Sequence, residues 1–202
     1  MRDPENITEI SLLHPDMMGF IFYPPSPRNA IGISKETIKS IPEDVTPVGV
    51  FVNTPMESIV AILRDLGITH VQLHGNESPQ DCKMLKKLGF TVIKAFRIPT
   101  SADKSIFDKL QLYEDAIDYF LFDTAGFAPG GNGNKFDWEI LRVYSSPIPF
   151  ILSGGISEAD ASNLQNGLPE KCVGIDLNSR FEDSPVMKNV FKINEFIKQI
   201  MQ

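Results

Sequence analysis

The feature that most constrains the fold is a regular alternation between short apolar runs and longer segments with helical periodicity. The runs are mostly continuous rather than alternating in polarity, which is typical of strands covered on both faces of a parallel sheet. Strands that alternate with helices in this way predict βαβ units. The predicted strands are residues 17–23, 48–52, 70–74, 91–96, 119–122, 150–152 and 173–177.

The segments between these runs carry the sequence signals of helix ends. Ser78 is placed as the N-cap of one helix. Thr54 has the position of a capping-box residue, with Pro55 as the first helical residue. Residues 189–201 are predicted as the last helix, with Phe191 among its apolar positions.

Two architectures fit this alternation, an open doubly wound sheet and a closed barrel. No Gly-x-Gly-x-x-Gly turn follows an early strand, which weakens the dinucleotide-binding form of the open sheet. Polar or glycine-rich sequence follows nearly every predicted strand, as a barrel with functional βα loops requires. We therefore predict an α/β fold, a (β/α)8 TIM barrel, that forms a single domain over residues 1–202.

The predicted barrel is one strand short at its beginning. Residues 3–13 already have the pattern of a helix, so the strand that should precede this helix is absent from the 202 residues. A barrel has no free edges only when its last strand pairs with its first. We expect strand 1 of the barrel to be missing from this chain.

Charge and cysteine content argue against several classes of function. The net charge is −7, whereas nucleic acids and anionic membranes attract surfaces rich in Lys and Arg. The sequence has no apolar run as long as a membrane span and no apolar signal-peptide core. Its two cysteines, Cys82 and Cys172, have no metal-like spacing and predict a reducing compartment. We expect a cytoplasmic protein with no nucleic-acid or membrane partner.

The first candidate site residue is Arg28, which follows three prolines in the loop after the first predicted strand. The prolines stiffen this loop, so the arginine stands on a constrained platform. A fixed guanidinium can bind a carboxylate or a phosphate through two parallel hydrogen bonds. The alternative is an ordinary solvated surface arginine.

Two further candidates stand at the carboxyl ends of predicted strands, where barrel active sites lie. His74 ends one strand and predicts either a substrate contact or a histidine satisfied by loop backbone. Asp123 comes directly after the buried run 119–122. Partial burial there would raise a carboxyl pKa and suit the group to general-acid work. An Asx turn or a loop cap is the structural alternative for Asp123.

Turns after the last two strands predict a phosphate site. One turn lies between a strand and a helix start near Ser157, where backbone N–H groups and the positive end of a helix attract anions. The last strand leads into polar sequence that begins with Asp176, a candidate substrate-binding residue. Such turns at the last two βα loops form the phosphate site that is common in this barrel class. The candidate phosphate-binding residues are Gly154, Gly155, Ser179 and Arg180.

Two other features have less specific interpretations. Residues 129–133 are rich in glycine and predict a movable substrate cover, with a plain connector as the alternative. Neither cysteine is a good candidate for a nucleophile. Cys82 falls inside a predicted helix, and Cys172 precedes the last strand, at the end opposite the expected active site. Both are predicted to be structural.

The motifs, taken in their order along the chain, resemble the phosphoribosylanthranilate isomerase family of (β/α)8 barrels. Each motif alone is weak, but together they cover nearly the whole chain and are highly specific. The matching sequences are GFIFYPPSPR at 19–28, VGVFVN at 48–53, VQLHG at 71–75, Asp123 with GGNG at 130–133, FDW at 136–138, SGG at 153–155 and GID at 174–176.

The resemblance implies an Amadori rearrangement of a phosphorylated small molecule, with no cofactor and no metal. N-(5′-phosphoribosyl)anthranilate becomes 1-(2-carboxyphenylamino)-1-deoxyribulose 5-phosphate. The position of Asp123 is that of the general acid, which protonates the furanose ring oxygen. A cysteine then removes the C2 proton. Arg28 matches the arginine that receives the anthranilate carboxylate, and the turns around Gly154 and Ser179 match the phosphate-binding loops. A monomer or a homodimer is expected.

Two departures from the family pattern stand out. Arg180 occupies a position where the family usually has glycine, and backbone donation to a phosphate tolerates that change. The family also begins with a strand that ends in Lys-x-Cys-Gly, directly ahead of the residues that match Met1 onwards. General-base catalysis contributes roughly 10²–10⁴-fold, so the chain without this cysteine is expected to be severely impaired. The alternatives are a non-catalytic phospholigand-binding remnant and another phosphosugar isomerase on the same barrel.

Overall fold

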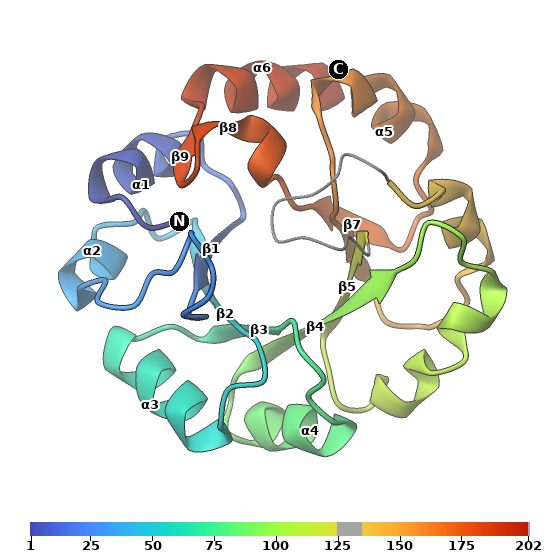
Figure 1. Cartoon of the computed structure of the whole chain (residues 1–202), viewed down its shortest axis with the longest axis horizontal. Helices are drawn as coiled ribbons and strands as arrows, with labels where there is room; N and C mark the ends of the chain where they lie inside the picture. The colour runs from blue at the N-terminus through green and yellow to red at the C-terminus, as the bar shows by residue number, and fades with distance from the viewer. Residues whose placement is uncertain (125–134, 202) are drawn as a thin grey trace.

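The computed structural model describes residues 1–124 and 135–201. Its centre is a curled parallel sheet, and the helices form a ring around this sheet (Figure 1). Each of its strands overlaps one predicted strand. The strands are β1 (Met17–Ile21), β2 (Thr46–Phe51), β3 (His70–Leu73), β4 (Thr91–Ile98), β5 (Tyr119–Thr124), β6 (Phe150–Leu152) and β7 (Cys172–Ile175).

The strands follow one another around the sheet in chain order, from β1 at one edge to β7 at the other. Every neighbouring pair is parallel. Because the strands run the same way, all of their carboxyl ends meet at one rim. The predicted fold class is confirmed: the chain has the architecture of a (β/α)8 barrel in which the described residues supply a sheet of seven strands.

The connections between the strands are partly α-helical and partly 3-10 helical. The two connections from β4 to β6 contain only 3-10 helices in the described residues, where the sequence predicts a full set of helices. The α-helices are α1 (Pro4–Ser11), α2 (Lys35–Lys39), α3 (Met56–Leu66), α4 (Pro79–Lys87), α5 (Ala161–Gly167) and α6 (Val190–Ile200). The 3-10 helices are η1 (Lys104–Phe107), η2 (Leu110–Tyr113), η3 (Trp138–Val143), η4 (Glu158–Asp160) and η5 (Ser179–Phe181).

The helix starts follow local side-chain chemistry. Ser78 caps α4 as predicted: its Oγ accepts from Asp81 N at 3.2 Å, and its backbone N donates to Asp81 Oδ2 at 2.8 Å. The predicted capping box at Thr54 is wrong. Helix α3 begins at Met56, and Pro55 precedes it with a ψ of 139° and no side-chain cap hydrogen bond. Proline fixes only φ, so the extended ψ at Pro55 delays the helix by one residue.

The apolar core consists of two clusters, one on each face of the curled sheet. A large cluster fills the space between the sheet and the helices. Successive strand residues face opposite sides of a sheet, so Arg97 and Asp123 share the inner face with Ala95 and Leu121, two positions before them. The smaller cluster lies inside the barrel and consists of Val48, Ile93, Ala95, Leu121 and Ile151.

A short antiparallel hairpin follows β7 and was not predicted. Its strands are β8 (Glu182–Ser184) and β9 (Met187–Lys188), too short for a periodic pattern to reveal them. Figure 1 shows the hairpin between α1 and α6. The Asn6 side chain accepts from Lys188 N at 2.8 Å and donates to Lys188 O at 2.9 Å. The hairpin is therefore tied to the first helix of the chain.

The last helix has the predicted position and, except for Phe191, the predicted apolar face. Ile193 and Phe196 are buried, whereas Phe191 is 73% exposed. Each helical residue turns the chain by about 100°, so Phe191 lies on the opposite side of α6 from Ile193. Phe191 therefore takes no part in the core.

Candidate active site

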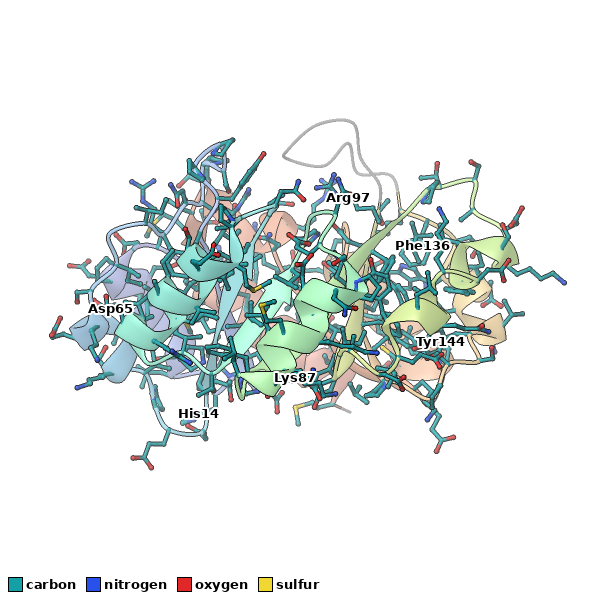
Figure 2. All side chains as sticks on the ribbon, turned by 90° about the horizontal axis from the view of Figure 1, so that it is seen from below. His14, Asp65, Lys87, Arg97, Phe136 and Tyr144 are labelled. Carbon is teal, nitrogen blue, oxygen red and sulfur yellow. The ribbon has the colours of Figure 1, made fainter. Side chains whose placement is uncertain are left out.

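Figure 2 shows the molecule from the side and identifies its two rims. Arg97, near the carboxyl end of β4, lies at the upper rim. His14 and Lys87, which precede β1 and β4, lie towards the lower rim. The upper rim is thus formed by the carboxyl ends of the strands, which the sequence predicts as the site.

The structure brings two of the predicted site residues into contact. His74 Nε2 lies 3.2 Å from Asp123 Oδ2, although 49 residues separate them in the chain. The other ring nitrogen, Nδ1, lies 3.0 Å from Gln72 Nε2. Because the Gln72 amide donates to Nδ1, a neutral His74 carries its proton on Nε2 and donates it to Asp123. Both side chains are partly exposed at the rim.

The loop that carries His74 is fixed by a buried ion pair. Lys94 Nζ donates to Gly75 O at 2.7 Å, to Glu77 Oε2 at 3.0 Å and to Leu73 O at 3.2 Å. Glu77 also accepts from the backbone N–H groups of Asn53 at 2.8 Å and Gly75 at 3.0 Å. This network joins the loops after β2 and β3 to β4. It holds the backbone on both sides of His74.

Sequence reasoning missed the role of this network. The signal was Lys94, a lysine inside the otherwise apolar run TVIKAF. A buried lysine requires a partner, and this requirement alone pointed to a carboxylate nearby. The sequence did not identify Glu77 as that carboxylate, because the two residues meet only once α4 has folded against the sheet.

Arg28 makes a bidentate ion pair with Glu182, which the sequence did not predict. Arg28 Nε donates to Glu182 Oε1 at 2.8 Å, and Nη2 donates to Oε2 at 2.5 Å. Lys188 Nζ also donates to Glu182 Oε1, at 2.7 Å. The pair connects the proline-rich loop after β1 to the hairpin after β7, so it spans the two edges of the sheet.

The electrostatics of this cluster keep Glu182 ionised. Burial by itself raises the pKa of the Glu182 carboxyl, but hydrogen bonds and charges from Arg28 and Lys188 outweigh burial and lower that pKa to about 2. The hydrogen bond to Glu182 in turn raises the pKa of Arg28. Burial lowers the pKa of Lys188, against the pull of Glu182. Two cations thus share one carboxylate.

The turns after β6 and β7 lie side by side because these strands pair. Ser153 Oγ donates to Asp176 Oδ2 at 2.8 Å, which joins the start of one turn to the start of the other. Gly154 and Gly155 both have left-handed φ values, 94° and 71°. Further along, Ser179 is half-buried and Arg180 is exposed in η5.

The helix expected at Ser157 starts later than predicted. Ser157 donates from its backbone N to Asp160 Oδ2 at 2.7 Å, as a cap should. This cap opens only the 3-10 helix η4, and α5 follows from Ala161. The turn is therefore followed by a short 3-10 helix and not directly by the end of a long α-helix.

Gly154 packs directly against the candidate general acid. A Cβ atom at Gly154 would lie 2.3 Å from Thr124 N and 2.7 Å from Asp123 Oδ1. We expect Gly154→Ala to destabilise the fold by about 1–3 kcal/mol through backbone strain alone. We also expect it to lower kcat/KM, because Asp123 must move to make room. Urea unfolding and steady-state kinetics measure the two effects.

Gly89→Ala is the matched control for this variant. Gly89 has a similar φ of 91°, but no atom lies within 4 Å of its hypothetical Cβ. Gly89 also lies just before β4, at the rim opposite Asp123. The control should lose stability and keep its turnover. Equal turnover in the two variants contradicts the proposed contact between Gly154 and the acid.

Arg97 is a rim residue that sequence reasoning missed. It is the register partner of Asp123 in the pairing of β4 with β5. Its side chain is exposed, unlike the apolar residues that precede it on the inner face of β4. The sequence signal was a charged residue at a position where the two-residue alternation of the strand faces inwards. Only the strand register shows that Asp123 is its neighbour.

Both cysteines lie where a catalytic thiol is not expected. Cys82 is fully buried in α4, and burial raises the pKa of its thiol to about 12. Cys172 begins β7, at the rim opposite Asp123, and burial raises its pKa as well. Thiolates are the reactive form of cysteine, so both positions agree with the predicted structural role.

The predicted substrate cover at residues 129–133 lies outside the described residues. Over residues 1–124 and 135–201, no helix has the length and apolar character needed to cross a bilayer. Within the same ranges, no group of three or more His, Cys, Asp or Glu side chains is placed to hold a metal ion.

Comparison with known proteins gives the chain its family. The family model described as N-(5′-phosphoribosyl)anthranilate (PRA) isomerase matches residues 1–199. The N-(5′-phosphoribosyl)anthranilate isomerase of Parabacteroides distasonis is 44% identical over 203 residues, which cover 100% of this chain and 90% of that relative.

Solved structures agree with this match. The phosphoribosyl anthranilate isomerase of Thermotoga maritima is 28% identical, with a TM-score of 0.84, over 100% of this chain and 95% of that chain. Another phosphoribosyl anthranilate isomerase, solved in complex with reduced 1-(o-carboxyphenylamino)-1-deoxyribulose 5-phosphate, is 27% identical, with a TM-score of 0.81 and the same coverage. With its motifs, its barrel and these matches, the chain belongs to the N-(5′-phosphoribosyl)anthranilate isomerase family.

Proposed function

We propose that this chain isomerises N-(5′-phosphoribosyl)anthranilate to 1-(2-carboxyphenylamino)-1-deoxyribulose 5-phosphate in tryptophan biosynthesis. The observation that carries the proposal is the contact between His74 and Asp123 at the carboxyl-end rim, in a chain whose family match spans residues 1–199. We propose that the protein acts in the cytoplasm. A monomeric or homodimeric state stays a prediction.

The first chemical step is ring opening, and Asp123 is its acid. The protonated carboxyl group donates to the furanose ring oxygen, the bond from C1 to that oxygen breaks, and a Schiff base forms between C1 and the anthranilate nitrogen. Asp123 is left as a carboxylate. His74 Nε2–H, 3.2 Å from Asp123 Oδ2, stabilises this carboxylate.

The second step moves a proton away from C2. A general base removes it, the electron pair of the C2–H bond forms a C1=C2 bond, and the C1=N electron pair moves onto the imine nitrogen, which kept its proton during ring opening, to give an enolamine. Protonation at C1 and loss of the C2 hydroxyl proton then give the ketone.

The ligand groups are assigned to separate parts of the rim. Arg28 receives the anthranilate carboxylate through its guanidinium. The phosphate lies at the turns after β6 and β7, where Gly154 and Gly155 offer backbone donors and Ser179 and Arg180 add side chains. Asp176, oriented by Ser153 Oγ at 2.8 Å, is suited to accept from ligand hydroxyl groups.

The general base is proposed to be a thiol ahead of Met1. Cys82 and Cys172 are the two cysteines of the chain, and their positions do not suit the task. A strand ending in Lys-x-Cys-Gly, placed between β7 and β1, would bring a thiol to the same rim as Asp123. It would also pair both edges of the sheet.

The test compares three proteins: residues 1–202, the same residues preceded by a strand that ends in Lys-x-Cys-Gly, and that extended protein with serine in place of the cysteine. We expect the cysteine version to exceed both others in kcat by about 10²–10⁴-fold. Both extended proteins should be more stable than residues 1–202, because the strand closes the sheet. The serine version therefore separates the chemistry from the packing.

Two results contradict the proposal. Equal turnover by residues 1–202 and by the cysteine version means that the base lies elsewhere. Absence of isomerisation by all three proteins, with retained binding of reduced 1-(o-carboxyphenylamino)-1-deoxyribulose 5-phosphate, identifies a non-catalytic binding protein instead.

A further inference from the structure

We propose that Glu182 is a positioning residue for Arg28: it holds the guanidinium with one edge turned to the ligand and so sets the selectivity for an aromatic carboxylate. The inference rests on the proposed function, because it takes from there the assignment of the anthranilate carboxylate to Arg28. It concerns a residue that touches the arginine and not the reacting atoms.

The contacts divide the guanidinium into a used edge and a free edge. Glu182 accepts from Nε at 2.8 Å and from Nη2 at 2.5 Å, which occupies the side-on edge of the group. Arginine has five N–H donors in a planar fork. The N–H groups of Nη1 and the second N–H of Nη2 form the other edge. That edge matches a second carboxylate in the same bidentate manner.

Burial places Glu182 behind the arginine and not in front of it. The Glu182 side chain is 4% exposed, and the Arg28 side chain is 17% exposed. A ligand that arrives from the rim therefore meets the guanidinium first. A carboxylate in front would compete with the ligand, whereas a carboxylate behind orients the donor.

Lys188 also holds Glu182 in place and is itself fixed by Asn178 and Asn6. Lys188 Nζ donates to Glu182 Oε1 and to Asn178 Oδ1, both at 2.7 Å. The backbone of Lys188 is tied to Asn6 in α1 by two hydrogen bonds. The formal charges of Arg28, Lys188 and Glu182 sum to one positive charge, which the anionic ligand can neutralise.

The physical benefit of this arrangement is preorganisation. Arg28 follows three prolines that stiffen its loop, but its own side chain is long and rotatable. Ordering such a side chain at the moment of binding weakens affinity. The pair with Glu182 orders the guanidinium during folding, before any ligand arrives.

If Glu182 only balanced charge, one variant would change the affinity for the ligand in the opposite direction. Glu182→Gln adds one unit of positive charge to the site, so charge balance alone predicts tighter binding of every anionic ligand. Positioning predicts weaker binding of the ligand that carries the aromatic carboxylate. It predicts no such loss for a ligand that lacks this group.

The experiment measures dissociation constants by calorimetry for two probes. One is reduced 1-(o-carboxyphenylamino)-1-deoxyribulose 5-phosphate, and the other is the same molecule without its carboxyl group. We expect Glu182→Gln to weaken binding of the carboxylated probe about tenfold and binding of the other probe less than about twofold. Arg28→Lys should show the same pattern. The double variant of Arg28→Lys with Glu182→Gln should lose no more affinity for the carboxylated probe than either single variant.

Two further variants act as controls. Glu139→Gln removes the same charge from the exposed Glu139–Arg142 pair and should bind both probes like the parent protein. Glu182→Asp keeps the charge and shortens the reach, so it should lose part of the selectivity even if Glu182→Gln folds poorly. Thermal unfolding of each variant reports on folding.

Each contrary outcome identifies what has failed. Tighter binding of both probes by Glu182→Gln, or an equal loss for both probes, overturns the positioning role. Loss of selectivity in Arg28→Lys but not in either Glu182 variant also overturns this inference, and it leaves the proposed function intact. Failure of the parent protein to prefer the carboxylated probe overturns the assignment of Arg28, and the inference falls with it.

Discussion

Replacing Asp123 with asparagine is expected to lower kcat/KM for N-(5′-phosphoribosyl)anthranilate by about 10²–10⁴-fold, the usual range for loss of a general acid. Asparagine has nearly the same shape, and its side-chain oxygen can still accept from His74 Nε2, which lies 3.2 Å from Asp123 Oδ2 in the parent. An amide cannot supply an acidic proton to the furanose ring oxygen. The measurement is the steady-state rate of isomerisation, in the protein that carries the added Lys-x-Cys-Gly strand.

The control for this variant is Asp65→Asn, which removes the same charge from an exposed position in α3. We expect this control to keep its turnover. Unfolding curves should show that both proteins are folded. If Asp123→Asn retains kcat/KM within about threefold of the parent, Asp123 is not the acid, since that loss lies far below the range for a general acid.

The largest effect on stability is expected for Lys94→Met, at about 3–5 kcal/mol. The side chains of Lys94 and Glu77 are 3% and 6% exposed, and Nζ lies 3.0 Å from Glu77 Oε2. Methionine leaves the Glu77 carboxylate buried without its partner. The carbonyl groups of Leu73 and Gly75 lose a donor as well. Urea unfolding followed by circular dichroism measures the loss.

Two companion variants make this prediction specific. Lys94→Met combined with Glu77→Gln should be more stable than Lys94→Met alone, because no uncompensated charge remains buried. Lys198→Met removes a lysine from an exposed pair with Glu195 and should change stability by less than about 1 kcal/mol. A loss of less than 1 kcal/mol in Lys94→Met means that water reaches the pair and that the network does not fix the His74 loop.

The sequence predicted those parts of the molecule that depend on local pattern. Continuous apolar runs located the strands, and the position of Asp123 after one of them placed it at the rim formed by the carboxyl ends of the strands. The Gly154 turn and the loop of Arg28 were assigned to the same rim in the same way. Each of these residues lies at the end of a strand or in the loop that follows it, so its rim can be assigned without knowledge of distant contacts.

The features that the sequence did not predict depend on contacts between distant segments. Arg28 and Glu182 are 154 residues apart, and nothing near Glu182 in the sequence marks it as the partner of an arginine. Arg97 lies beside Asp123 only because of the register between β4 and β5. Phe191 was assigned to the core because hydrophobicity suggests burial, although the turn of α6 points it outwards.

The hydrogen bonds between Asn6 and Lys188 have a consequence for how the protein is made. They join residues 182 positions apart, so the first helix gains this partner only after residue 188 has left the ribosome. During synthesis from the N-terminus, α1 is therefore made long before the segment to which it is hydrogen-bonded, and it is fully anchored only after the hairpin β8–β9 has formed.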